Sequence, residues 1–168
     1  METDRLILRR FEDKDLDDLY AYLCDAETLH YEPYPPMTRK ETEKELHRRI
    51  NDPQMIAVER KEDHRLIGNL WLGSTSETQK ELGFVFHHMY WHHGYAKEAC
   101  TAVIKDAFDH GVKIIMAKCD PENENSWRLL DALGMKRVQH LHANVYFFKD
   151  ENGNPIWKDT YIYELQKQ

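Results

Sequence analysis

The chain has 168 residues, of which 41% are hydrophobic and 32% charged, and its formal net charge is −7. This length fits one domain, residues 1–168, with a sizeable core. No apolar run approaches the roughly 20 residues of a membrane span. The acidic balance, broken only by short basic groups such as Arg9-Arg10, argues against nucleic acid as a partner. We therefore expect a soluble globular protein that uses neither nucleic acid nor a membrane.

The cysteines and the N-terminal residues indicate the compartment. The three cysteines, Cys24, Cys100 and Cys119, form no CxxC pair, which argues against a disulfide framework or a zinc finger. The first ten residues contain no apolar signal core. Both observations favour a cytoplasmic protein.

The first half of the chain predicts a strand, two helices and three further strands. A proline-rich loop, residues 30–36, separates the helices, and Thr38 with Glu41 has the spacing of a capping box. The strands that follow the helices are joined by short polar turns, which predicts an antiparallel meander. The expected strands are 5–10, 55–58, 66–72 and 79–86, and the expected helices are 12–23 and 39–50.

The second half predicts a parallel crossover followed by a hairpin. A helix over 96–110 connects the strand at 79–86 to a buried strand at 112–117, and a strand–helix–strand connection makes the two strands parallel. A short helix then begins at Asn123 or Asn125 and ends at Gly134. Two long strands, about 138–149 and 157–165, close the chain.

The stretch from Glu81 to Ala99 links strand to helix through a tight turn. Leu82, Phe84 and Phe86 alternate on one face of the strand. The free N–H groups at the start of the helix, together with the helix dipole, form a site suited to phosphate. Gly94 allows a ligand to approach the main chain closely. The sequence predicts that this turn holds a cofactor pyrophosphate.

Three blocks in the right order resemble the GNAT superfamily of acetyl-CoA-dependent N-acetyltransferases, and within it the RimJ/RimL type. The blocks are Thr3 to Arg9, then Glu81-Leu82-Gly83-Phe84 through Tyr90-Trp91 and Gly94 to Ala99, and finally Asp120 to Ser126 with Leu129-Leu130 and Leu133-Gly134-Met135. The resemblance implies an α/β fold that is α+β-like: a mixed, mostly antiparallel sheet of about seven strands, about four helices and a splayed parallel strand pair. It also implies acetyl-CoA as co-substrate and is compatible with a homodimer.

The chain departs from the superfamily pattern at the phosphate turn and in the following helix. Trp91 stands where Gln or Arg is more usual, and His92 and His93 replace a small and a basic residue. Leu130 occupies the position where many members carry a tyrosine that protonates the leaving thiolate. The resemblance still implies cofactor contacts from the residues of the splayed strand, the turn and the short helix: Phe84, Val85, Phe86, His92, His93, Gly94, Tyr95, Ala96, Lys97, Asn123 and Arg128.

Acetyl transfer to an amine needs a base, an oxyanion donor and an acid for the thiolate. Glu81 is the predicted base, and the alternative is a solvent-facing strand glutamate. A main-chain N–H near Val85 is the predicted oxyanion donor. Ser126 is the predicted acid, and the alternative is a serine that only caps the helix. Asn123 anchors the turn or binds cofactor, while Lys97 and Arg128 either meet phosphate or are surface charges.

Two further sets of residues complete the predictions. Aromatic residues with a carboxylate suit a cationic amine, so Tyr31, Glu32, Tyr34 and Trp71 are predicted to line the acceptor cleft, with plain packing as the alternative. The paired histidines His87-His88 and His92-His93 invite a metal interpretation. Adjacent strand residues point to opposite faces, and no carboxylate is placed by spacing, so no metal is expected.

The sequence thus predicts an N-acetyltransferase that moves an acetyl group from acetyl-CoA directly to the primary amine of a peptide N-terminus or a small molecule. The alternatives are a non-catalytic acetyl-CoA-binding sensor or partner, and an enzyme that uses another acyl chain length. The sequence does not identify the acceptor.

Overall fold

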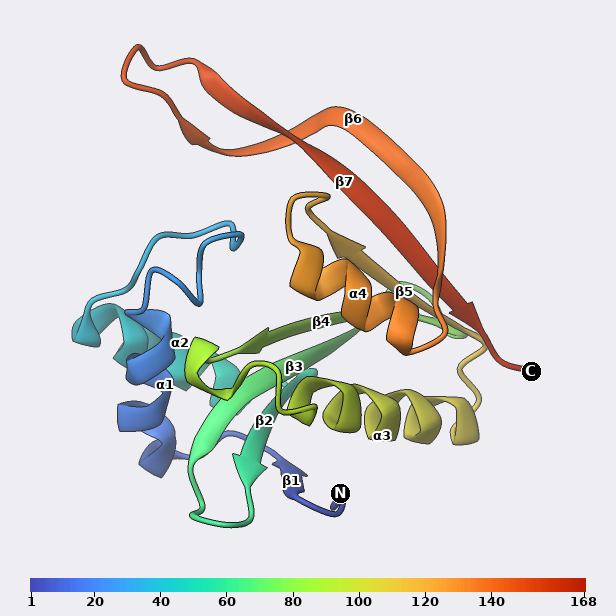
Figure 1. Cartoon of the computed structure of the whole chain (residues 1–168). Coiled ribbons are helices and arrows are strands. Elements are labelled where there is room, and N and C mark those ends of the chain that lie inside the picture. Colours follow the sequence, from blue (N-terminus) through green and yellow to red (C-terminus); the bar gives the residue numbers. More distant parts are fainter.

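A computed structural model describes residues 1–168 as one open seven-stranded sheet with helices on both faces (Figure 1). The strand order is β1-β2-β3-β4-β5-β7-β6, and only the β4–β5 pair is parallel. The strands are β1 (Leu6–Arg9), β2 (Met55–Arg60), β3 (Leu66–Ser74), β4 (Gln79–Phe86), β5 (Ile114–Cys119), β6 (Lys136–Lys149) and β7 (Pro155–Gln166). The helices are α1 (Leu16–Leu23), α2 (Arg39–Asn51), α3 (Tyr95–Asp109) and α4 (Glu124–Ala132), with short 3-10 turns η1 (Asp13–Asp15) and η2 (His88–Tyr90). The predicted mixed sheet with four helices is confirmed.

Local sequence determines where the second helix begins. The Thr38 side chain accepts the Glu41 N–H, and the Glu41 carboxylate accepts the Thr38 N–H at 2.7 Å. This reciprocal pair is the capping box expected from the sequence, and it satisfies two backbone donors that a helix start leaves free. The N-terminus of α2 therefore follows directly from residue types three positions apart.

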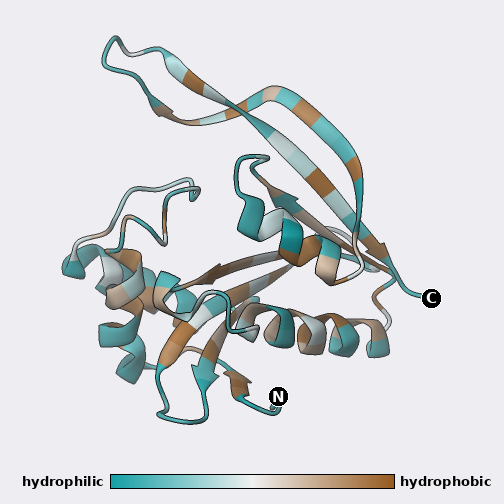
Figure 2. Ribbon diagram, in the orientation of Figure 1, coloured by the Kyte–Doolittle hydropathy of each residue, from teal (hydrophilic) through white to brown (hydrophobic).

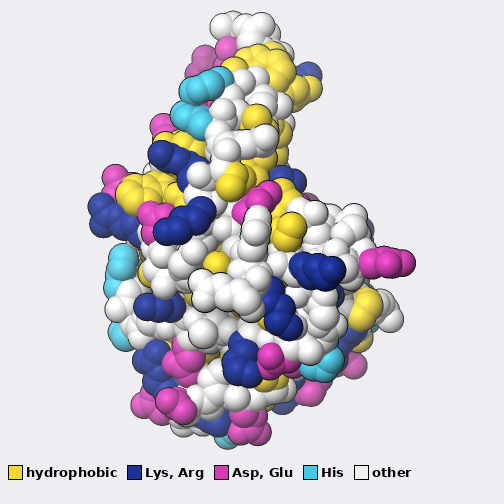
Figure 3. All heavy atoms as spheres, turned by 90° about the vertical axis from the view of Figure 1, so that its right-hand side faces the viewer, with side chains coloured by type: hydrophobic (Ala, Val, Ile, Leu, Met, Phe, Trp, Pro, Cys, Tyr) yellow, Lys and Arg dark blue, Asp and Glu magenta, His cyan; other side chains and the backbone are white.

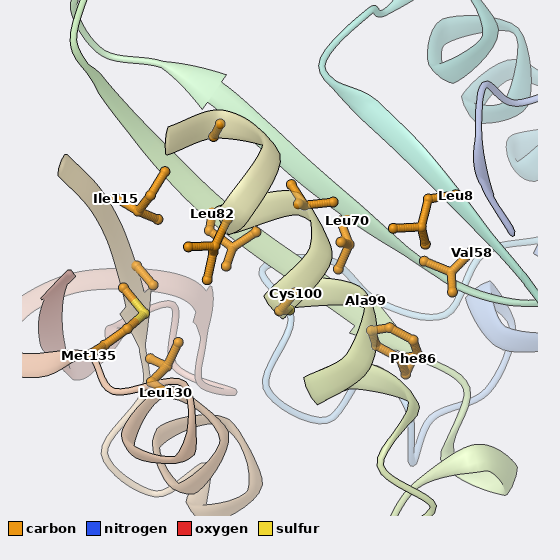
Figure 4. Packing of buried hydrophobic residues seen from close by; sticks show 14 of the residues in the cluster. Leu8, Val58, Leu70, Leu82, Phe86, Ala99, Cys100, Ile115, Leu130 and Met135 are labelled. Carbon is orange, nitrogen blue, oxygen red and sulfur yellow. The ribbon is translucent and has the colours of Figure 1, made fainter. Parts of the chain in front are cut away.

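Alternation along β4 divides the apolar residues between two cores. Leu82 and Phe86 pack with Ala99 of α3 and Leu130 of α4 on one face of the sheet (Figure 4). Val85 points to the other face, where α1 and α2 cover a second core. Figure 2 shows hydrophobic residues concentrated in the central strands that these helices cover. Packing on both faces therefore fixes the position of β4.

The β6–β7 hairpin projects from the rest of the molecule (Figure 1). Most of β6 is exposed, in contrast to the central strands. Large hydrophobic side chains lie exposed along the two strands: Val138, Leu141, Tyr146, Phe147, Phe148, Ile156 and Trp157. None of the helices is both long and apolar enough to cross a membrane.

Candidate active site

The two parallel strands separate after three paired residues. Gln79–Glu81 pairs with Ile114–Met116, and the rest of β4 has no partner on that side. Beyond this point β4 leads into η2 and α3, while β5 leads into α4. Beside the diverging strands lies a cleft of about 520 Å³, lined by the end of β4, the starts of α3 and α4, and the loop between α1 and α2.

The open edge of β4 presents the main chain of Phe84 to the cleft. Successive strand residues direct their N–H and C=O groups to alternate edges. The His87 N–H donates to the Ile67 carbonyl of β3 at 3.0 Å, so the Val85 N–H also faces β3. The groups of Phe84 and Phe86 face the open side, where the Phe86 carbonyl accepts the Trp91 indole N–H at 2.7 Å. Phe84, rather than Val85, therefore carries the N–H directed into the cleft.

The start of α3 forms one wall of the cleft. Gly94 is the N-cap residue, with a φ of +81°, and no side chain caps the helix. The first α3 N–H bonded to a preceding carbonyl is that of Glu98, which donates to the Gly94 carbonyl at 3.0 Å. The earlier amides, on Tyr95, Ala96 and Lys97, have no helical carbonyl before them. This geometry suits an anion, as the sequence indicated.

Arg5 holds the turn in place from the other end of the chain. Its Nη1 donates to the His93 carbonyl at 2.9 Å and its Nε to Glu98 Oε2 at 2.7 Å. The Arg5 guanidinium also lies over the Tyr95 ring, 4.4 Å from its centre. Burial would raise the pKa of the Glu98 carboxyl, but hydrogen bonds from Thr3 and Arg5 hold that pKa below its ordinary value. Glu98 therefore stays ionised at neutral pH and keeps its ion pair with Arg5. We call the contacts of Arg5 with Glu98 and with the His93 carbonyl the Arg5 brace.

The start of α4 forms the opposite wall. The Asn123 side chain accepts the Ser126 N–H at 3.2 Å, so Asn123 caps the helix. Ser126 is half-buried and lines the cleft, and its hydroxyl makes no hydrogen bond within the protein. Leu130 is fully buried in the core and does not line the cleft.

Two cations reach the cleft from the starts of these helices. Lys97 is exposed and forms no ion pair. Arg128 pairs with Glu124 at 2.8 Å and lies over the Trp127 ring. Together with the α3 amides they give this end of the cleft a positive character.

The other end of the cleft is formed by the loop between α1 and α2. Tyr31 and Glu32 line it, as expected. Burial raises the pKa of the Glu32 carboxyl to about 7, with Arg49 acting in the opposite direction. The Glu32 carboxylate makes no ion pair or hydrogen bond within the protein. Arg49 is engaged elsewhere, since it donates to Asn69 Oδ1 at 2.8 Å and to Glu45 Oε1 at 2.8 Å.

Four of the predicted site residues lie outside the cleft lining. Glu81 sits at the closed end of the splay, where its Oε2 pairs with Lys118 Nζ at 3.0 Å. The His93 ring stacks on Tyr95. Tyr34 and Trp71 pack against the second core. All the other predicted site residues line the cleft. The positions of these four depend on strand register and on packing, and neither can be read from the spacing of residues in the sequence.

Other lining residues were missed by the sequence interpretation. They come from the same loop, from η2 and its turn, and from the inner side of α4: Glu27, Thr28, His30, Tyr90, Trp91, Asn125, Leu129 and Ala132. Thr28 is held by Asp25, which also accepts from His88 Nδ1 at 2.6 Å. No local pattern links Asp25 to His88, because the contact spans 63 positions.

The splayed parallel pair places a cleft beside a helix N-terminus that suits an anion. The comparisons with known proteins give the class of protein that has this arrangement. The acetyltransferase (GNAT) domain family matches residues 5–136, so the chain belongs to this family and is an N-acetyltransferase. An uncharacterised N-acetyltransferase of Bacillus subtilis, YnaD, is 30% identical over 99% of this chain and 96% of its own length.

Two solved structures extend the comparison. An acetyltransferase (GNAT family) from Bacillus anthracis superposes with a TM-score of 0.89 at 27% identity, covering 99% of this chain and 97% of its own. A spermidine N-acetyltransferase from Vibrio cholerae, in complex with CoA and spermine, has a TM-score of 0.79 at 18% identity, covering 98% of this chain and 96% of its own. At that identity the second structure supports the shared fold alone.

Proposed function

We propose that this enzyme transfers the acetyl group of acetyl-CoA directly to a primary amine that is cationic in solution. The observation that carries the proposal is one continuous cleft with opposite character at its two ends. The α3 amides and Lys97 lie at one end, and the unpaired carboxyl of Glu32 lies at the other. The open edge of β4 lies between them, where a thioester would be positioned.

The cofactor end would hold the pyrophosphate on the amides of Tyr95, Ala96 and Lys97. The helix dipole favours negative charge there, and the Lys97 ammonium adds a second attraction. Arg128 is close enough to the same cleft to assist. The pantetheine arm would lie along the unpaired edge of β4. The proposed cofactor contacts also include His92, Asn123 and the β4 residues Val85 and Phe86, and His93 through its backbone.

In the reaction, the amine must lose a proton before it can attack the thioester carbonyl. Glu32 is the better placed base, because it lines the cleft and its pKa lies near neutrality. Glu81 remains the alternative, through a water chain from the closed end of the splay. The Phe84 N–H would stabilise the oxyanion. The Ser126 hydroxyl would give a proton to the departing thiolate and take one from solvent in the same step.

The acceptor proposed is an amine small or extended enough to reach Glu32 past Tyr31. Aromatic faces and a carboxylate suit an alkyl ammonium group. A small polyamine and a peptide N-terminus both meet this requirement. The Vibrio cholerae enzyme of the same fold is a spermidine N-acetyltransferase in complex with CoA and spermine. Assignment to the RimJ/RimL type rests on the three sequence blocks and implies no ribosomal substrate.

Assay of thiol release from acetyl-CoA with a panel of polyamines, amino acid amides and peptides tests the function. We expect turnover with at least one class of cationic amine. Glu32→Gln, Glu81→Gln and Ser126→Ala then separate the roles: the largest fall in kcat is expected for Glu32→Gln and the smallest for Glu81→Gln. Tight acetyl-CoA binding without turnover of any acceptor would support the non-catalytic sensor instead.

Two wider features belong to the same proposal. The three cysteines are all free, as is usual in a reducing compartment, which supports a cytoplasmic location.

The apolar surface of the β6–β7 hairpin supports a homodimer, because exposed patches of this kind mark interaction sites.

A further inference from the structure

A second cluster of polar residues lies on the projecting hairpin, away from the cleft. The pairing of β6 with β7 shifts register between Leu141 and Val145. Ala143 sits in this bulge with a φ of +42°, a conformation that is unusual for a residue with a side chain. The bulge brings His140 and His142 of β6 beside Asp159 of β7. Figure 3 shows histidine side chains on this projecting part, next to hydrophobic ones.

Both imidazoles converge on one carboxylate oxygen. His140 Nε2 lies 2.7 Å and His142 Nδ1 3.0 Å from Asp159 Oδ2, and the ring centres are 3.9 Å apart. The other oxygen, Oδ1, accepts the Ala143 N–H at 2.8 Å. This backbone bond orients the carboxylate and is the leading cause of a lowered pKa of Asp159, with His140 next. One oxygen is therefore held by the bulge while the other faces two ring nitrogens.

We propose that His140, His142 and Asp159 form a binding site for a divalent transition-metal ion, with Zn²⁺ as the expected occupant. The three ligand atoms lie within 4.8 Å of one another. Two neutral imidazoles and one carboxylate are ligands that Zn²⁺ accepts, whereas Ca²⁺ and Mg²⁺ favour sites built from oxygen.

The distances fit a site that needs little rearrangement. Ligands bonded at about 2.0–2.1 Å to a tetrahedral ion lie about 3.3 Å apart. The present separations from Oδ2, 2.7 Å for His140 Nε2 and 3.0 Å for His142 Nδ1, are about 0.6 and 0.3 Å shorter than this, as hydrogen bonds require. The ion would replace the shared protons, and small side-chain rotations would widen the gap.

The site leaves coordination positions open. His142 is 74% exposed, while His140 and Asp159 are about one-third exposed. Water would complete the coordination sphere. Since the ligands come from two strands that meet at a bulge, the ion would clamp β6 to β7 where their regular ladder is interrupted.

A second group, Asp25 with His87 and His88, also places its ligand atoms close together. There, however, Asp25 Oδ2 accepts both the Thr28 N–H and the Thr28 hydroxyl, in addition to His88. The oxygen that would bind metal is already occupied by fixed donors. The hairpin cluster is therefore the better site, and none of its three residues lines the cleft.

Isothermal titration of the full-length, tag-free protein with Zn²⁺ at pH 7.5 tests the site. We expect one ion per chain and at least about a tenfold loss of affinity in Asp159→Asn, since even outer-shell changes cost metal sites 10–100-fold. His142→Gln, at an exposed position that leaves the fold undisturbed, should weaken binding similarly. His47→Gln, at another exposed histidine, is the matched control and should bind as the parent does.

Two further measurements complete the test. Co²⁺ should give visible absorption bands of a nitrogen and oxygen site in the parent and in His47→Gln, and lose them in His142→Gln. Zn²⁺ should slow amide exchange at the bulge in the parent and in His47→Gln, but not in His142→Gln. Failure of the parent to bind Zn²⁺ at micromolar concentration, or equal binding by the parent and His142→Gln, would overturn the proposal. Equal binding would place the ion elsewhere, for example at Asp25.

Discussion

Glu32 gives the cleft a carboxyl group that ionises near neutral pH. Burial raises its pKa to about 7, so the group gains its charge as the pH rises through that value. If the carboxylate takes the proton of the amine, kcat/KM should rise with pH and level off above about 7. Glu32→Gln should remove this inflection and lower kcat by roughly 10²–10⁴-fold. A pH–rate profile measures both effects.

Glu27→Gln is the matched control for this profile. Glu27 lines the same cleft, but its side chain is 67% exposed. Its replacement should leave the inflection in place. A Glu32→Gln enzyme that retains the inflection would show that another group is the base, and Glu81 would then be the next candidate.

The raised pKa of Glu32 also predicts a stability change. Between an unfolded value near 4.5 and a folded value of about 7, the folded state binds the proton more tightly than the unfolded state does. The free energy of unfolding should therefore fall as the pH rises through this range. Glu32→Gln should flatten that part of the pH dependence, as measured by urea unfolding at pH 5 and pH 8. A slope equal to that of the parent would contradict the assignment.

Substitutions at two glycines with positive φ can distinguish backbone strain from an effect on ligand binding. An alanine at Gly94 would be held at a φ of +81°, which costs about 1–2 kcal/mol of stability. Its side chain would also stand at the phosphate turn, so the dissociation constant for acetyl-CoA should rise several-fold. Gly111→Ala has the same strain, with a φ of +94° and open space around it. Gly111→Ala should lose stability but keep its affinity for acetyl-CoA. An equal loss of affinity in both variants would contradict the assignment of the Gly94 turn as the phosphate site.

At the scale of elements, the start of α3 depends on a residue from the beginning of the chain. Removing the Arg5 side chain frees the His93 carbonyl and the Glu98 carboxylate. Because Arg5 is half exposed, we expect Arg5→Ala to weaken acetyl-CoA binding by roughly 1 kcal/mol, or about fivefold. Arg48→Ala removes a similarly exposed ion-paired arginine from α2 and should not alter binding. Fluorescence titration with acetyl-CoA compares the two variants. Unchanged affinity in Arg5→Ala would show that the Arg5 brace does not contribute to cofactor binding.

The sequence predicted elements well where the determinants are local. The limits of β4 match, and the capping box at Thr38 begins α2 as expected. The splay of the β4–β5 pair was expected from the family resemblance alone, because register between distant strands depends on packing on both faces that local patterns do not show. That register places Glu81 at the closed end of the splay. For the same reason, the sequence did not predict that Asp25 contacts His88 or that Asp159 contacts His140 and His142.

At the scale of the whole molecule, the projecting hairpin leaves apolar surface that the fold itself does not cover. Tyr146 and Trp157 lie opposite each other on β6 and β7, with ring centres 5.3 Å apart, and both are exposed. If this surface joins two copies, sedimentation velocity should give a dimer for the parent protein. Trp157→Glu should then shift the protein to the monomer, because it places a charge in the contact. Gln139→Glu adds the same charge at a polar position of β6 and should remain dimeric. A parent protein that sediments as a monomer across the concentration range would contradict this assembly, while leaving the acetyltransferase cleft, formed within one chain, unaffected.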